Sequence, residues 1–154
     1  MSRPKFLADH DLNEQIVVGV LRRAPTLEFR RVRELGFEER NDAFLLDYAT
    51  AQGFIVVSHD VNTMPAAAYE RLAEGRGITG LFMVQQSLPI GSIIDDLCLV
   101  ISFALFRPPG SPVLLGFSET GAIFSNTLVN RKCAQESKNR RNMQFFLIFT
   151  LENR

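Results

Sequence analysis

Three aspartates, Asp9, Asp42 and Asp60, are the residues of this chain whose type and spacing could do chemistry. Asp9 ends an apolar stretch that begins at Phe6, and Asp60 ends another that begins at Phe54, while Asp42 opens an amphipathic segment between them. Carboxylates in a dry interior are costly unless cations, hydrogen bonds or water surround them. Mg²⁺ and Mn²⁺ prefer such oxygen ligands. The three aspartates therefore predict a carboxylate-lined metal site.

One or two divalent ions at such a site would activate a water molecule, orient a phosphodiester and neutralise charge at the attacked phosphorus. Each acid also has a structural explanation. Asp42 could be the N-cap of a helix, and Asp60 could form an Asx turn, which are common roles of aspartate. Both explanations stay open at the level of the sequence.

Polar residues beside the three acids are candidates for a second layer around the metal or for contact with substrate. These residues are His10, Asp11, Ser58, His59 and Asn62. A histidine next to a strand end is also a common hydrogen-bonded structural residue. Asn62 could complete the metal ligands or cap the helix that follows it.

Hydrophobic periodicity predicts the elements that position these side chains. We expect strands at residues 5–8, 27–33, 54–58 and 81–84, and helices at residues 12–23 and 41–52, from Thr63 towards Gly75, and after Pro89. Asp11 is a suitable N-cap for the first helix. The alternation of strands and helices predicts an α/β fold with a parallel sheet and helices on both faces. In a strand order of 2-1-3-4, Asp9 and Asp60 would meet at the carboxyl ends of neighbouring strands, where ligands bind.

Composition argues against a protein that binds nucleic acid through its overall charge, a membrane-spanning protein and a secreted protein. The chain has 154 residues, of which 46% are apolar, enough for one core. Its 17 basic residues balance 17 acidic ones, so no overall positive field holds nucleic acid. The longest apolar run, residues 97–106, is shorter than the roughly 20 residues that a membrane span needs. No signal-peptide region follows Met1. We expect a cytoplasmic protein without a membrane segment.

Three segments together resemble a family of small bacterial PIN-like proteins in the PIN ribonuclease superfamily. They are Phe6-Leu7-Ala8-Asp9-His10-Asp11-Leu12, Asn41-Asp42-Ala43-Phe44-Leu45-Leu46-Asp47-Tyr48-Ala49 and Val56-Val57-Ser58-His59-Asp60-Val61-Asn62. The resemblance covers residues from about 5 to about 106. It implies a PIN-like domain over residues 1–106, with a three-layer α/β/α fold and a short, mainly parallel sheet. Ser58 stands where the family usually has threonine, and His10 where it has an acid.

The resemblance also implies an activity. Asp9, Asp42 and Asp60 match the acidic positions that bind Mg²⁺ or Mn²⁺ in the superfamily, so they are the expected catalytic and metal-binding residues. The expected protein is a metal-dependent endoribonuclease, a hydrolase that acts as the toxin of a bacterial toxin-antitoxin system. Its partners would be an RNA substrate and a cognate antitoxin protein. Separately, an uncovered apolar surface expected near the fourth helix would suit a homodimer or another partner interface.

Two other functions stay open. The first is a PIN-like binding module, with weak or no catalysis, that acts through a protein or nucleic-acid partner. The second is a phosphatase of the haloacid-dehalogenase type, since Asp9 and Asp11 resemble its aspartate pair. Such an enzyme would need further acids, for which Asp95 and Asp96 are available, although a solvated helix face explains these two better.

Residues 107–154 depart from the pattern of the first 106. They contain the chain breaker Pro108-Pro109-Gly110 and a polar, basic stretch at residues 130–142. We expect a divergent tail that leaves one edge of the sheet uncovered, with residues 145–151 as a candidate replacement strand.

Overall fold

A sheet of seven strands forms the centre of the protein in the computed structural model, which describes residues 3–105, 115–118, 123–125 and 143–148. Its first four strands are parallel and follow the predicted order β2-β1-β3-β4. Their bounds are Lys5–Ala8 for β1, Glu28–Arg31 for β2, Phe54–Ser58 for β3 and Leu81–Val84 for β4. The predicted α/β class with a mainly parallel sheet is confirmed.

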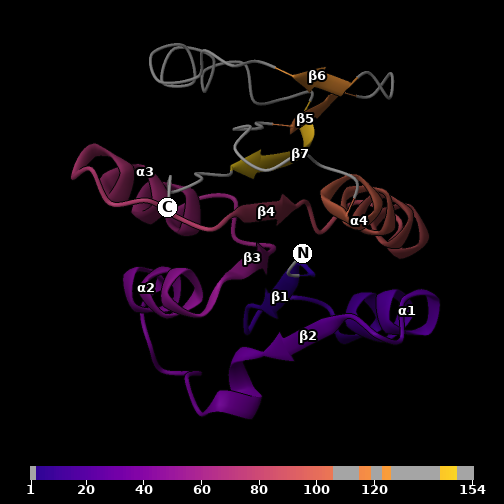
Figure 1. Ribbon diagram of the computed structural model, residues 1–154, viewed down its shortest axis with the longest axis horizontal. Coiled ribbons are helices and arrows are strands. Elements are labelled where there is room, and N and C mark those ends of the chain that lie inside the picture. Colours follow the sequence, from indigo (N-terminus) through magenta and orange to yellow (C-terminus); the bar gives the residue numbers. More distant parts are fainter. Residues whose placement is uncertain (1–2, 106–114, 119–122, 126–142, 149–154) are drawn as a thin grey trace.

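Helices cover both faces of this sheet, which gives three layers (Figure 1). On one face lie α1 (Glu14–Arg23) and α4 (Ile90–Leu105), and on the other lie α2 (Asp42–Gln52) and α3 (Thr63–Ala73). Each face of the sheet has its own hydrophobic core, and alternate residues of a strand belong to different cores, because successive side chains of a strand point to opposite faces. Phe6 packs in the core under α1 and α4, and Leu7 packs in the core under α2 and α3.

The central strand β3 is buried along its whole length, as its continuous run of apolar residues predicts. The preceding helix α2 ends at Gly53, which has a φ of 74° and closes the helix in the left-handed conformation that favours glycine. This tight ending leads directly into Phe54. The local sequence thereby determines where β3 begins and which residue, Ser58, lies at its carboxyl end.

Two element boundaries differ from the prediction. The first helix begins at Glu14 because Asn13 is its N-cap and accepts a hydrogen bond from the Gln15 N–H, so the prediction of Asp11 as the cap was wrong. The second strand ends at Arg31, where the chain turns into a short 3₁₀ helix, η1 (Val32–Leu35). Asp11 is therefore available for other contacts.

Three further strands extend the sheet beyond β4. The next strand in space is β7 (Met143–Ile148), which pairs antiparallel with β4, and β5 (Leu115–Ser118) and β6 (Ile123–Ser125) follow it. The prediction of an uncovered sheet edge was wrong, because β7 supplies backbone hydrogen-bond partners to β4. The candidate replacement strand at residues 145–151 overlaps β7, and residues 149–151 lie outside the described part of the chain.

The described residues include no helix that is both long enough and apolar enough to cross a membrane.

Gly19 of α1 lies against Ile94 of α4 and gives a test of this packing. A Cβ atom at residue 19 would lie 2.2 Å from Cδ1 of Ile94. Overpacking of this kind costs roughly 1–3 kcal/mol, and the higher helix propensity of alanine returns about 1 kcal/mol. We expect Gly19→Ala to lower the free energy of unfolding by up to about 2 kcal/mol in urea titrations.

The control is the same substitution in an Ile94→Ala background, where the obstructing side chain is absent. There, Gly19→Ala should raise the free energy of unfolding, because only the gain in helix propensity remains. An equal loss in both backgrounds would show that the two helices do not meet at this point.

Candidate metal centre

The carboxyl ends of β1 and β3 bring the predicted acids of these strands to the same edge of the sheet. Asp9 follows β1 directly, and its backbone N–H donates to the Val57 carbonyl at 2.9 Å. The Asp9 side chain is only 1% exposed. Asp60 comes two residues after the end of β3. The predicted proximity of the two segments follows from the parallel register of β1 and β3.

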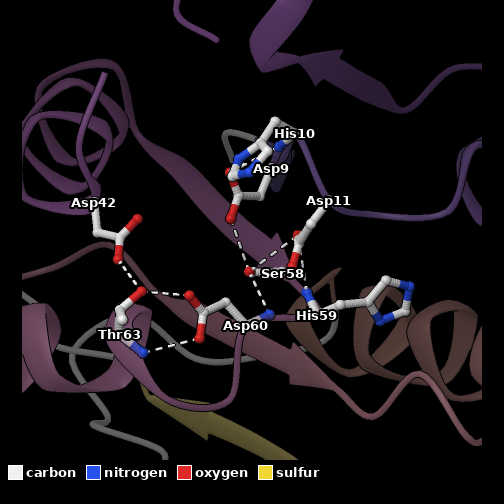
Figure 2. A network of polar contacts seen from close by, with 8 residues as sticks. All are labelled: Asp9, His10, Asp11, Asp42, Ser58, His59, Asp60 and Thr63. Atoms are coloured by element: carbon white, nitrogen blue, oxygen red, sulfur yellow. Dashed lines mark hydrogen bonds and ion pairs between the residues drawn. The ribbon is translucent and has the colours of Figure 1, made fainter. Parts of the chain in front are cut away.

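The buried hydroxyl of Ser58 connects the segments that carry these acids (Figure 2). Its Oγ atom lies 2.8 Å from Oδ2 of Asp9 and 3.3 Å from Oδ1 of Asp11. The same atom accepts a hydrogen bond from the backbone N–H of Asp60 at 2.9 Å. A serine hydroxyl has one proton, so it can donate to only one of the two carboxylates at a time.

Asp60 forms an Asx turn, as its structural explanation predicted. Its Oδ1 atom accepts hydrogen bonds from the backbone N–H groups of Asn62 and Thr63, both at 2.8 Å. The Thr63 hydroxyl donates to Oδ2. Burial disfavours the ionised carboxylate, but these hydrogen bonds outweigh burial, so the pKa of Asp60 lies below its ordinary value. These hydrogen bonds therefore favour the ionised form of Asp60.

Asp42 is not the N-cap of α2, so the capping role that the sequence suggests for it was wrong. The cap is Asn41, whose side chain accepts a hydrogen bond from the Phe44 N–H at 2.9 Å. Asp42 is the first residue of the helix, and its Oδ2 atom lies 2.6 Å from the Thr63 hydroxyl oxygen. The structure thereby brings Asp42 together with Asp60 through one shared neighbour (Figure 2).

Asp11 joins the site as a fourth carboxylate. It accepts a hydrogen bond from the backbone N–H of His59 at 3.2 Å, in addition to its contact with Ser58. Burial raises the pKa of Asp11 above its ordinary value, and the charge of Asp9 acts in the same direction, although the His59 N–H opposes them. Asp11 and Asp9 thus share one hydroxyl, as Asp42 and Asp60 share another.

The two histidines have different positions relative to the carboxylates. Nδ1 of His10 lies 3.0 Å from Oδ1 of Asp9, and the His10 side chain is 59% exposed. His59 instead has its Nδ1 atom 2.8 Å from the Val84 carbonyl, and its ring points away from the acids (Figure 2). A carbonyl only accepts, so Nδ1 of His59 donates. His10 therefore belongs to the site, while His59 contributes its backbone N–H.

Of the two residues at the beginning of α3, Thr63 and not Asn62 places its side chain against the site carboxylates. Asn62 makes no side-chain hydrogen bond as a helix cap, and its backbone N–H serves Asp60. Thr63, predicted only as the beginning of a helix, contacts both Asp42 and Asp60. Its spacing of three residues after Asp60 suits a hydrogen bond to that side chain, but the contact with Asp42 depends on how α2 and α3 pack.

The donors at the site are hard oxygen atoms, the ligand type that Mg²⁺ and Mn²⁺ prefer. Besides backbone N–H groups, the four carboxylates have as partners two hydroxyl protons and the His10 ring. The arginine and lysine ion pairs of the described residues go to other acids. This shortage of positive charge fits a cation. The four acids nevertheless lie in two pairs, and the described residues contain no group of three or more histidine, cysteine or acidic side chains arranged to hold a metal ion.

The distal acids expected for a dehalogenase-type phosphatase lie on α4. Asp95 forms an ion pair there with Arg23 of α1, which agrees with the expected solvated helix face. Burial and the charge of Asp95 raise the pKa of Asp96 above its ordinary value. Neither residue makes a contact with the four site carboxylates in the described structure.

The contact between His10 and Asp9 predicts how His10 titrates. The hydrogen bond with Asp9 raises the pKa of His10 above its ordinary value of 6.5; burial opposes this, and the charges of Asp9, Asp11 and Asp42 add to it. We expect NMR titration of the His10 ring to give a midpoint above 6.5. Because the folded pKa is raised, the stability that this contact contributes is fully present below the unfolded pKa and is lost as the pH rises through the folded pKa.

The matched variant for this titration is Asp9→Asn, which removes the negative charge and should move the His10 midpoint back towards its ordinary value. His59 is the only other histidine of the chain, so the His10 signal can be assigned with a His10→Gln variant. A His10 titration midpoint at or below 6.5 in the wild type would mean that the ring forms no hydrogen bond with the Asp9 carboxylate.

Comparison with known proteins places the chain in no family. No protein-family model, no curated protein and no solved structure matches it. The chemistry of the site must therefore be argued from its own residues.

Proposed function

We propose that the protein is a Mg²⁺- or Mn²⁺-dependent hydrolase that cleaves phosphodiester bonds of RNA, a ribonuclease of PIN type. One observation supports the proposal: near the carboxyl ends of β1 and β3, four carboxylates lie in two pairs, each pair sharing one hydroxyl group. Like charges at such short distances repel, and a divalent cation is the partner that removes this repulsion.

Asp9, Asp42 and Asp60 would hold the ion, and each is fixed differently. Asp9 is buried and accepts hydrogen bonds from Ser58 and from the His10 backbone N–H. Asp60 is held by the backbone at the beginning of α3. Asp42 comes from the beginning of α2, so the ligands belong to three separate segments. Fixing ligands on strand ends and helix starts favours a defined geometry over a mobile one.

A bound ion supplies a water of lowered pKa and stabilises the charge that develops on the phosphate. In the hydrolysis, the water oxygen would form a bond to phosphorus as the bond between phosphorus and the leaving ribose oxygen breaks, and the proton that the water loses would pass through solvent to that ribose oxygen. The chain's own residues orient the ion and the phosphodiester. His10, exposed and held by Asp9, lies where it can contact the substrate.

RNA as the substrate, a cognate antitoxin and a toxin role are proposed from the resemblance to PIN-like proteins. Five arginines, Arg22, Arg23, Arg30, Arg31 and Arg33, could guide RNA to the site. Four of them form ion pairs with acids: Arg23 with Asp95, Arg30 with Glu28, and Arg31 and Arg33 with Glu14. The basic residues at 131–141 lie outside the described part of the chain. Any contact with RNA beyond the site is therefore local.

A second candidate is a binding module that has kept the fold and acts through a protein or nucleic-acid partner. The observation that favours it is the arrangement of the acids in two pairs, without three that converge on one point among the described residues. The two functions differ in their need for metal. The hydrolase requires a divalent ion and the aspartates, whereas the binding module tolerates a chelator and Asp9→Asn.

Calorimetric titration of Mn²⁺ into the purified protein tests the hydrolase. We expect binding to the wild type and much weaker binding to Asp9→Asn and Asp60→Asn, because each removes a charged ligand. The matched control is Asp95→Asn, an exposed acid on α4 that should leave Mn²⁺ binding unchanged. Circular dichroism confirms that each variant is folded.

Cleavage of an unstructured, end-labelled RNA then tests the reaction. We expect Mn²⁺-dependent cleavage that EDTA and Asp60→Asn abolish. Metal binding without cleavage of RNA would leave a metal site of another function, and absence of metal binding by the wild type would favour the binding module.

A further inference from the structure

Asp42 is the least anchored of the three expected metal ligands. Asp9 is buried at the end of β1, and Asp60 accepts two backbone N–H groups. Asp42 lies at the first position of α2, where Asn41 already serves as the cap. Within the described residues, the hydrogen-bond partner of its carboxylate is the hydroxyl of Thr63.

Thr63 joins two elements that are distant in sequence. It is the first residue of α3, and its hydroxyl reaches Oδ2 of Asp42 on α2 as well as Oδ2 of Asp60 in the preceding turn (Figure 2). The helices α2 and α3 lie on the same face of the sheet. The Thr63 hydroxyl therefore connects the first residue of α2, Asp42, with the beginning of α3.

We propose that Thr63 is a positioning residue, whose hydroxyl places Asp42 of α2 beside Asp60 and so completes the set of metal ligands. This inference rests on the proposed metal site. It concerns the hydroxyl and not the shape of the side chain, because Thr63 is exposed and does not fill the core. The backbone N–H of Thr63 would hold Asp60 in any variant, so loss of the hydroxyl affects mainly Asp42.

The count of protons explains why a hydroxyl suits this position. Thr63 has one proton for two carboxylates, so one of the two oxygen atoms faces it without a hydrogen. The hydroxyl therefore donates to one acid at a time and leaves the negative charge of the pair for a cation. A lysine or arginine at this place would hold them equally well but would supply the positive charge that a metal ion otherwise provides.

The test compares the Mn²⁺ dissociation constants of three single variants and one double variant with that of the wild type. Thr63→Val keeps the branched shape and removes the hydroxyl, and Thr63→Ser keeps the hydroxyl. Loss of a residue that orients a metal ligand typically costs about 10- to 100-fold in affinity. We expect a loss of about tenfold or more for Thr63→Val, and retention of most of the wild-type affinity for Thr63→Ser.

The remaining variants are Asp42→Asn and the double variant Asp42→Asn with Thr63→Val. If Thr63 acts through Asp42, Thr63→Val should cause no further loss once Asp42 is replaced. A purely structural effect of Thr63 would add in both backgrounds. Urea unfolding of every variant shows whether the fold is retained, and Thr63→Ala is a second variant without the hydroxyl should Thr63→Val not fold.

The outcomes separate the two proposals. Equal Mn²⁺ affinity of the wild type and Thr63→Val, or an equal loss with and without Asp42, would overturn the role of Thr63 and leave the metal site standing. Absence of Mn²⁺ binding by the wild type would overturn the metal site and the role of Thr63 with it.

Discussion

The hydrogen bonds of the Ser58 hydroxyl are the interaction on which the arrangement of the acids depends. Ser58 is the last residue of β3 and is fully buried. From this position it reaches the carboxylates of Asp9 and Asp11 and accepts the N–H of Asp60. One side chain thus connects the turn after β1 with the turn after β3. The parallel pairing of the two strands makes this connection short.

Helix beginnings offset part of the cost of bringing negative charges together. Asp42 is the first residue of α2, and Asp60 accepts N–H groups at the beginning of α3. The amino end of a helix carries partial positive charge, which stabilises carboxylates there. Backbone dipoles and hydroxyl protons together allow the fold to form around four acids, while the remaining negative charge is available to a ligand.

The sequence was informative where a feature depends on local pattern. The run from Phe54 to Ser58 predicted a buried central strand, and the apolar ends of β1 and β3 placed Asp9 and Asp60 at one edge. The choice between neighbouring polar residues was not predictable. Asn13 and not Asp11 caps α1, and Asn41 and not Asp42 caps α2, because both members of each pair have suitable side chains and tertiary contacts select one. The role of Thr63 depends on helix packing and left no periodic pattern.

The pairing of β7 with β4 has a consequence for how the chain reaches this fold. The four parallel strands come from one continuous part of the chain, whereas β7 follows β4 only after a long stretch. During synthesis on the ribosome, β4 is therefore complete well before its antiparallel neighbour leaves the exit tunnel. In that interval its outer edge presents unpaired backbone groups to other nascent chains. The order of translation thus leaves this edge unpaired until residues 143–148 have been synthesised.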